Sequence, residues 1–359
     1  MRLRQLRLQN LRAFEAVEVD LDARWNVFVG PNGAGKTTLL EAAYLLSHAR
    51  SFRGGPKDAL VRRGAAGYSI FGSVGTSGGV LRALGLARVA GGFEARVDGA
   101  PATIAELIAN AAVVCFEPGS HELISGAAEG RRRFLDWGVF HVEHGFLATW
   151  RAFHRALRQR NALLRLGCRS EDLDPWDREL ARSGADLVAM RERYAGRFAP
   201  IVAETLGGLL PELGPARFVL DPGWAGDAEA LDQLGATRDD DLRRGFTTRG
   251  PHRTDWSITF EGAPRREHLS RGQEKLCALG CALAQAREFA ASRGEWPIVC
   301  IDDLASELDA PHQETLVATL RAVDAQILVT GTHEPAAISA AIPHAARFHV
   351  EPGRVARLL

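Results

Sequence analysis

The chain has 359 residues, 46% of them hydrophobic and 25% charged, and its formal net charge is zero. This composition suits two or three soluble domains, and neither a run of about 18 apolar residues nor a signal-like N-terminus is present. The five cysteines form no C-x-x-C pair, which favours a reduced compartment. We therefore expect a cytoplasmic protein with no membrane partner, whose affinity for nucleic acid, if any, comes from a local basic surface.

The first third of the chain has strand patterns around one helix. Apolar and polar residues alternate up to Leu21, and Val27–Val29 is a short apolar run. A glycine-rich loop follows, and Thr38–His48 has helical composition. From Tyr68 to Val97, alternating apolar residues broken by glycine pairs predict antiparallel strands joined by hairpins.

The middle of the chain is helical, and strands return after it. From about Arg131 to Leu210 the pattern is that of long helices with breaks near Gly167 and Pro175. Strand patterns reappear at 255–260, 297–301 and 326–329. The sheet is therefore discontinuous in sequence, which predicts an α/β fold with a mixed sheet and an inserted helical arm. The expected divisions are 1–125, the first part of the sheet domain, 126–245, the arm, and 246–359, the second part.

A phosphate-binding loop is predicted at Gly30–Thr37, which matches G-x-x-x-x-G-K-[ST] between an apolar strand and a helix. Its glycines let backbone N–H groups and a helix N-terminus face phosphates. Lys36 is expected to reach the β- and γ-phosphates of ATP, and Thr37 to hold Mg²⁺; a chance glycine-rich turn is the alternative. Lysine is otherwise rare here, so a compact ammonium is favoured at this position. The predicted ATP-binding residues are Gly30, Pro31, Asn32, Gly33, Ala34, Gly35, Lys36, Thr37 and Thr38.

Two carboxylates follow the apolar strand at 297–301. Nucleotide-binding sheets present metal-binding and water-activating groups at this edge. We expect Asp302 to bind the metal together with Thr37, and Asp303 to act as general base, so that Lys36, Asp302 and Asp303 are the candidate catalytic residues. A helix-capping aspartate is the alternative.

The segment Leu269–Gln273 precedes a helical pattern and resembles the L-S-G-G-Q signature of ABC-type ATPase heads, with Arg271 replacing the first glycine. The resemblance implies that Ser270, Arg271, Gly272 and Gln273 bind the γ-phosphate of ATP held by a second subunit, at another helix N-terminus. An ordinary N-cap with a glutamine in the first turn is the alternative.

Two more segments resemble parts of such heads. Ser306 and Asp309 lie in a segment similar to the loop through which one head touches its partner, and His333 follows a strand where many heads place a γ-phosphate sensor. A histidine on a surface loop is the alternative for His333. Many of these heads carry Glu where this chain has Asp303, which is one methylene shorter, so the resemblance implies slow hydrolysis.

The spacing of these motifs narrows the class of ATPase head that the chain resembles. Lys36 and Ser270 are farther apart than in a transporter head, and no Gln-loop is evident. Structural-maintenance and Rad50-type proteins insert far longer coiled coils, whereas two helices of about 30 residues reach only about 45 Å. The whole set resembles the RecF family, through Asn10–Phe14, Gly30–Ala42, Ser51–Arg53, Arg131–Asp136, Gly250–Arg253, Ser270–Gln273 and Asp302–Asp309.

Resemblance to the RecF family implies an ABC-type P-loop ATPase head with a short helical arm, and ATP and Mg²⁺ as cofactors. It also implies an ATP-dependent homodimer that clamps gapped DNA or single-strand/double-strand junctions, with a weak DNA-stimulated ATPase. The expected role is in recombinational repair, replication and the SOS response, helping RecA loading with RecO and RecR. An ABC transporter ATPase subunit is the alternative, and a nuclease-associated or structural head a third. The loop Phe116–His121 departs from the family pattern, so its role in sensing nucleotide stays open.

A DNA-contact surface is suggested by arginines at helical spacing within 145–165. Such a row contacts phosphates without reading sequence. Nearby Glu171, Asp172 and Asp174 could instead neutralise it, and the run Arg131–Arg133 could either contact DNA or anchor the arm through ion pairs. The candidate DNA-binding residues are Arg151, Arg155, Arg158 and Arg165.

Overall fold

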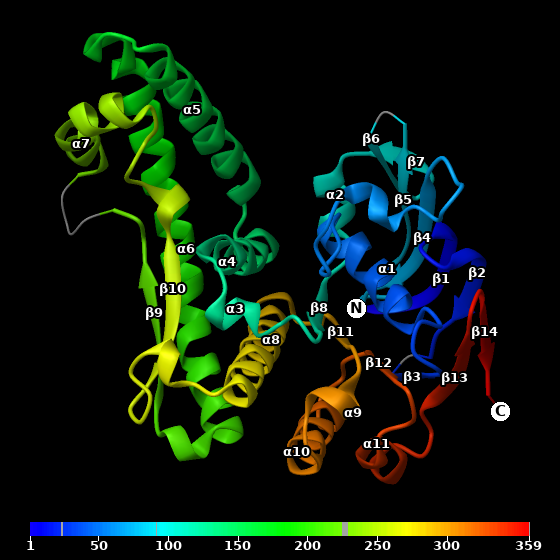
Figure 1. Cartoon of the computed structure of the whole chain (residues 1–359). Helices are drawn as coiled ribbons and strands as arrows, with labels where there is room; N and C mark the ends of the chain where they lie inside the picture. The colour runs from blue at the N-terminus through cyan, green and yellow to red at the C-terminus, as the bar shows by residue number, and fades with distance from the viewer. Residues whose placement is uncertain (23, 91, 225–228, 359) are drawn as a thin grey trace. The chain divides into compact units, whose positions relative to one another are not determined.

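The computed structural model describes residues 1–22, 24–90, 92–224 and 229–358 (Figure 1). Its contacts separate two compact units, one of Met1–Ser120 with Gln285–Leu359 and one of His121–Ala284. The second unit thus includes residues 246–284, which the sequence-based division places with the C-terminal part of the head. The reason is local: β10 (Asp255–Phe260) pairs along its whole length with β9 (Ala216–Asp221) of the helical unit.

The first unit contains an antiparallel sheet in the order β2-β1-β4-β5-β6-β7. The leucines of β1 are buried while its arginines are half-buried or exposed, as expected for a sheet with one solvated face. The predicted hairpins are confirmed, since β4, β5 and β6 pair in succession. The strands are β1 (Arg2–Leu11), β2 (Phe14–Asp20), β4 (Tyr68–Gly75), β5 (Leu81–Val89), β6 (Gly92–Val97) and β7 (Ala100–Ala102).

A second six-stranded sheet has the order β14-β13-β3-β12-β11-β8 and is parallel except for β14. All residues of β11 and β12 are buried, which is why β11 is an unbroken apolar run and β12 begins with one. The helix α1 (Lys36–His48) packs against strands of both sheets and fills the core of this unit. The strands are β3 (Trp25–Val29), β8 (Val113–Phe116), β11 (Ile298–Ile301), β12 (Ile327–Gly331), β13 (Ala346–Glu351) and β14 (Arg354–Arg357).

Short helices complete the first unit. The helix α2 begins with a capping box, in which Thr103 and Glu106 satisfy each other's backbone N–H groups. α9 follows β11 and α11 follows β12, as βα connections do. The short helices are η1 (Lys57–Leu60, a 3₁₀ helix), α2 (Ile104–Ala109), α9 (Leu304–Glu307), α10 (Ala310–Arg321) and α11 (Ala336–Ala341).

The second unit is mainly helical. Its centre is an antiparallel pair of helices, α5 of 21 residues and α6 of 36 residues. The expectation from the sequence is two helices of about 30 residues each, so α5 is shorter and α6 longer than expected. α5 ends at Gly167 in the left-handed conformation, which confirms the break predicted there. The helices are α3 (Glu122–Ser125), α4 (Ala128–Val142), α5 (Phe146–Leu166), α6 (Asp174–Leu209), α7 (Ala230–Arg244) and α8 (Arg271–Arg293, whose last residues belong to the first unit), with 3₁₀ turns η2 (Ser170–Leu173), η3 (Pro211–Leu213), η4 (Pro251–Arg253) and η5 (Arg266–His268).

Candidate nucleotide site and nucleic-acid interface

The loop between β3 and α1 is shaped by glycines that no other residue could replace. A Cβ on Gly30 would lie 2.0 Å from the Val350 carbonyl oxygen, and Gly35 has φ 107 with its Cβ direction blocked by the Phe14 ring at 2.8 Å. Gly35 is the N-cap of α1 and provides no side-chain cap. The first N–H groups of α1 are therefore free of a side-chain acceptor, which is the arrangement that binds phosphate.

Lys36 lies inside this loop rather than in solvent. Its Nζ donates to the carbonyl oxygens of Gly30 at 2.8 Å and Pro31 at 2.9 Å. Burial lowers the pKa of Lys36, and the nearby Asp303 and Asp302 oppose that shift. A phosphate oxygen is a stronger acceptor for an ammonium than a carbonyl, so Lys36 is placed to exchange these partners for phosphate.

Asp302 links the phosphate loop to the parallel sheet. Its Oδ1 accepts hydrogen bonds from Thr37 Oγ1 at 2.9 Å and from Thr330 Oγ1 at 2.6 Å. Burial raises the pKa of Asp302, while the bonds from Thr330 and Thr37 lower it. Thr330 is a site residue that the sequence reading missed; its only signal is a polar residue near the carboxyl end of an apolar strand.

Asp303 adopts a conformation that is rare outside glycine, with φ 55 and ψ 45. Its backbone N–H donates to Thr330 Oγ1 at 2.8 Å. Asp303 is at the N-cap position of α9 but its side chain makes no capping bond, and its Oδ1 is buried without a hydrogen-bond partner among the described residues. The capping alternative therefore does not account for this side chain, and such local strain accumulates at functional sites.

The residues present fit a magnesium ion that is shared with a nucleotide. Mg²⁺ prefers oxygen ligands and is usually held by one or two protein groups, substrate phosphates and water. Thr37 and Asp302 offer a hydroxyl and a carboxylate side by side, and Asp303 adds an unpaired buried oxygen. Within the described residues no group of three or more His, Cys, Asp or Glu could hold a metal alone, so phosphate oxygens would have to complete the ligand set.

A second polar cluster gathers around Glu41 of α1. Glu41 is fully buried, and Arg12 donates to its two oxygens from Nε at 2.5 Å and from Nη2 at 2.7 Å. Ser51 also donates to Glu41. All three residues lie in segments that matched the family pattern, yet the sequence alone did not show that they meet.

The candidate signature residues lie in the second unit. The backbone N–H of Ser270 donates to Gln273 Oε1 at 3.0 Å, and the Gln273 N–H donates to Ser270 Oγ at 3.3 Å. The N-cap alternative is thus present in the structure, and it leaves the helix start exposed at Ser270, Arg271 and Gly272. A capped, exposed helix N-terminus is still an anion site, so a contact with a second subunit's ATP stays a prediction.

The remaining candidates of the first unit follow the parallel strands. His333 is exposed just beyond β12, which lies between β3 and β11 in the sheet, so the phosphate loop, His333 and Asp302 follow neighbouring strands. Asp309 is exposed and caps α10 by accepting from the His312 N–H at 3.1 Å, and Ser306 is exposed on α9. Their proposed roles toward a partner head stay predictions.

The arginine row predicted on 145–165 is present on α5. All four side chains are exposed, and none has a hydrogen-bond or ion-pair partner in the part of the chain described. Two of the three acids that could have neutralised it face other arginines, since Asp172 faces Arg169 at 4.0 Å and Asp174 pairs with Arg238 at 2.8 Å. We call these residues, Arg151, Arg155, Arg158 and Arg165, the arginine row.

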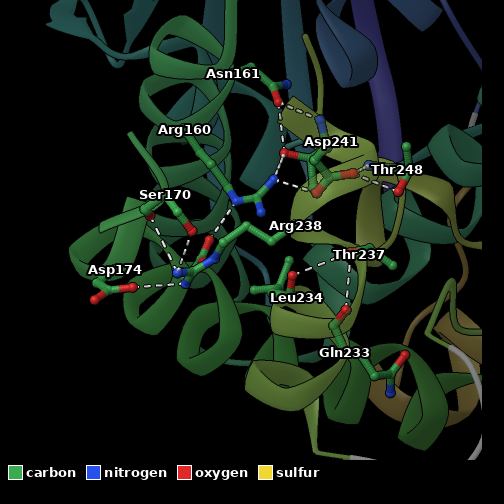
Figure 2. A network of polar contacts seen from close by, with 12 residues as sticks. Arg160, Asn161, Ser170, Asp174, Gln233, Leu234, Thr237, Arg238, Asp241 and Thr248 are labelled. Carbon is green, nitrogen blue, oxygen red and sulfur yellow. Dashed lines mark hydrogen bonds and ion pairs between the residues drawn. The ribbon is translucent and has the colours of Figure 1, made fainter. Parts of the chain in front are cut away.

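A buried ionic network fixes the orientation of α5 (Figure 2). Arg160 is fully buried and donates to Asp177 of α6 at 2.5 Å and to Asp241 of α7 at 2.7 Å. Arg238 of α7 donates to the other oxygen of Asp177 at 2.5 Å. Because Arg160 ties α5 to two helices, the arginine row on the exposed side cannot rotate inward.

The run Arg131–Arg133 mainly anchors the arm. Arg131 is buried and pairs with Asp255 through Nε at 2.7 Å and Nη2 at 2.9 Å. Arg132 donates to the Thr254 carbonyl at 2.9 Å, while Arg133 is exposed and pairs with Glu129. Of the two alternatives left open by the sequence, ion-pair anchoring therefore describes Arg131.

Comparisons with known proteins agree with this geometry. The model of the RecF/RecN/SMC N-terminal domain family matches residues 2–350. The chain is 46% identical to the DNA replication and repair protein RecF of Stenotrophomonas maltophilia (strain R551-3), and 44% identical to that of Xanthomonas axonopodis pv. citri (strain 306), each over 99% of both chains.

Solved structures show the same fold. A structure described as the recombination mediator protein RecF-ATP in the RecFOR pathway has a TM-score of 0.90 at 24% identity, covering 100% of this chain and 98% of its own. A Smc head bound to the C-winged helix domain of ScpA has a TM-score of 0.61 at 14% identity, covering 100% and 98%. These confirm the expected ATPase-head fold. No helix within the described residues is long and apolar enough to cross a membrane.

Proposed function

The chain belongs to the RecF family of DNA replication and repair proteins, and from this membership we propose that it is an ATP-gated DNA clamp of recombinational repair. The observation that carries the proposal is the meeting of Thr37, Asp302 and Asp303 beside an uncapped helix start. That arrangement suits a nucleotide triphosphate with its magnesium ion. The relatives are named as replication and repair proteins, so nothing favours the transporter alternative.

In the nucleotide-bound state, the N–H groups at the start of α1 donate to the phosphates and Lys36 exchanges its two carbonyl partners for phosphate oxygens. Bound Mg²⁺ supplies positive charge that neutralises the phosphates. Asp303 accepts a proton from, or orients, the attacking water through its unpaired oxygen. Because an aspartate reaches less far than a glutamate, we expect weak, DNA-stimulated hydrolysis that resets the clamp.

Two copies are expected to close on ATP. Ser270, Arg271, Gly272 and Gln273 of one copy contact the γ-phosphate held by the other, with Ser306, Asp309 and His333 at the same junction. Since the exposed N-terminus of α8 can bind an anion only when one is presented to it, dimerisation depends on ATP. This makes nucleotide the switch between an open monomer and a closed homodimer.

The arginine row provides the DNA contact. Four exposed arginines without acidic partners bind phosphates regardless of sequence, as a protein that acts at any gap requires. The DNA is proposed to be gapped or to carry a single-strand/double-strand junction. The expected partners are RecR and RecO, and indirectly RecA, in the cytoplasm.

Size-resolved DNA binding tests the proposal. Gapped duplex is mixed with the protein without nucleotide, with ADP, and with a slowly hydrolysed ATP analogue, and mass and DNA content are measured together. We expect dimers that retain DNA only with the ATP analogue. A protein that binds nucleotide but stays monomeric and retains no DNA would contradict the proposal and favour the transporter alternative.

A further inference from the structure

Two sequence segments that the nucleotide site does not use meet in the second unit. The segment Arg131–Asp136 lies on α4, and Gly250–Asp255 surrounds η4. Arg131 pairs with Asp255 through two hydrogen bonds at 2.7 and 2.9 Å. From α6, Arg191 pairs with Asp136 at 2.8 and 2.9 Å and also donates to the Pro251 carbonyl at 2.7 Å. We call this group of residues the arm-base junction.

The charges of the arm-base junction do not balance. Its two aspartates are each engaged by one arginine, Asp255 by Arg131 and Asp136 by Arg191. Arg132 and Arg253 are left without a carboxylate partner among the described residues, and Arg132 has only the Thr254 carbonyl as acceptor. Burial is the main cause that lowers the pKa of Arg132; Asp255 opposes the shift, and Arg191 and Arg253 add to it. Positive charge is therefore in excess here.

Arg253 is held in an exposed position. Its guanidinium carbon lies 5.6 Å from the centre of the Phe246 ring, and Phe246 is itself 39% exposed. The turn that carries it begins at Gly250, with φ 131, where a Cβ would come within 3.2 Å of the Trp224 ring. An arginine stacked on an aromatic ring keeps its planar fork oriented and its N–H groups available. Arg253 is thus presented outward rather than used for packing.

The histidine of the same turn does not contribute charge. His252 Nε2 lies 3.0 Å from the Thr247 carbonyl, so this nitrogen carries the hydrogen. Burial lowers the pKa of His252 to about 4, and the neighbouring Arg253, His154 and Arg132 act in the same direction. The ring is neutral at physiological pH, so within η4 the positive charge is that of Arg253.

We propose that Arg253, supported by Arg132, is a phosphate-contact point for the DNA backbone at the base of the arm. The ring of Phe153 on α5 stacks on the His252 ring of η4 with centroids 6.2 Å apart, so η4 packs against the helix that carries the arginine row. The inference rests on the proposed DNA binding and adds a second contact on another element. An open, exposed arginine fork suits a backbone phosphate that passes over it.

The salt dependence of DNA binding tests this contact. Affinity for gapped duplex is measured with the slowly hydrolysed ATP analogue between 50 and 200 mM salt, for the wild type and for Arg253→Gln. Each lost phosphate contact reduces the slope of log affinity against log salt by about 0.9, so the salt effect over this range should shrink by about 3.5-fold. Arg253→Lys should keep most of the slope because it keeps the charge.

Arg133→Gln is the matched control, because Arg133 is exposed on the same junction but pairs with Glu129. It should leave the slope unchanged, and equal melting temperatures would show that Arg253→Gln folds normally. An unchanged slope for Arg253→Gln in a wild type that binds DNA overturns the contact and leaves the proposed function standing. If the wild type binds no DNA, both fail. Saturable, Arg253-dependent binding of inorganic phosphate without any change in DNA slope would also overturn the assignment to DNA.

Discussion

Thr37 and Asp302 are 265 positions apart in the chain, yet the Thr37 hydroxyl donates to Asp302 Oδ1 at 2.9 Å. Thr37 is placed by the loop that leaves β3, and Asp302 by the end of β11, with β12 between the two strands. Thr330 of β12 donates to the same oxygen at 2.6 Å. One oxygen of Asp302, which follows β11, thus accepts hydrogen bonds from the residue Thr37 after β3 and from Thr330 in β12. Loss of either hydroxyl should change how Asp302 interacts with the other.

Thr330→Val should make Mg·ATP binding more sensitive to acid. Burial already raises the pKa of Asp302, and removing a hydrogen bond to its ionised form raises that pKa further. A proton competes with Mg²⁺ for the carboxylate, so affinity falls as pH drops through the Asp302 pKa. We expect the fall at a higher pH in the variant, measured by titrating a fluorescent ATP analogue with Mg²⁺ across about pH 4 to 8. Coincident profiles for both proteins would contradict the assignment, and binding without Mg²⁺ is the control.

Lys36→Arg should preserve the fold and lose tight nucleotide binding. The Lys36 ammonium fits between two loop carbonyls 2.8 and 2.9 Å away, where a planar guanidinium would not. We expect ATP affinity to fall at least about tenfold, a loss of about 1.4 kcal/mol or more, with little change in melting temperature. Calorimetric titration measures it, and ATP-dependent DNA retention that survived the change would show the site to be wrong.

Ser270→Ala should separate ATP binding from dimerisation. The lost N-cap costs about 1 kcal/mol of stability, but the phosphate loop in the first unit is untouched. We expect normal nucleotide affinity of the monomer and a dimer weakened at least tenfold with the ATP analogue, measured by analytical ultracentrifugation.

Thr103→Ala provides the control for Ser270→Ala, since Thr103 caps α2 in the same reciprocal manner with Glu106. It should cost a similar stability and leave the dimer intact. Equal weakening of the dimer in both variants would remove the case for a contact across the dimer.

Arg160→Met should destabilise the arm, whereas Arg158→Gln should weaken DNA binding alone. Removing Arg160 leaves the buried Asp241 without its arginine and Asp177 with Arg238 as its remaining ion-pair partner, which costs about 3–5 kcal/mol. Arg158 is exposed and unpaired, so its replacement should change stability by less than about 0.5 kcal/mol and reduce the salt slope of DNA binding by about one. Urea unfolding measures the stability of each variant, and DNA titration measures its salt slope. If Arg158→Gln lost as much stability as Arg160→Met, the prediction that Arg158 acts on DNA binding alone would be wrong.

The arm should lose stability as pH falls below about 6.5, the ordinary pKa of histidine. Burial lowers the pKa of His154 and of His252 to about 4 each, from an unfolded value of about 6.5. The unfolded chain therefore binds more protons between these values, so the stabilisation is complete above about pH 6.5 and is lost as pH falls toward 4. His252→Gln should unfold with a flatter pH dependence in urea titrations. A slope equal to that of the wild type would mean that His252 is not held neutral by the fold.

Much of the nucleotide site could be predicted because its residues lie in short, continuous segments whose sequence patterns are recognisable. The loop at Gly30–Thr37 needs glycines for steric reasons that apply at the backbone itself, as Gly30 and Gly35 show. The carboxylate pair after an unbroken apolar strand and the arginines at helical spacing are likewise local. Periodicity predicted the hairpins of 68–97 and the helix beneath the arginine row, since side-chain spacing reflects the geometry of a single element.

Other features depend on contacts between distant segments, which no local pattern specifies. Thr330 lies beside Asp302 because β12 is placed between β3 and β11 in the sheet. Residues 246–284 joined the helical unit because β10 pairs with β9, although their motifs belong with the head. Whether the run Arg131–Arg133 contacts DNA or anchors the arm could not be decided from the run itself, because the answer depends on which aspartates the fold brings near. The sequence by itself thus determined the residue types and their local geometry, and only the tertiary structure decided which charges are already paired and which face outward.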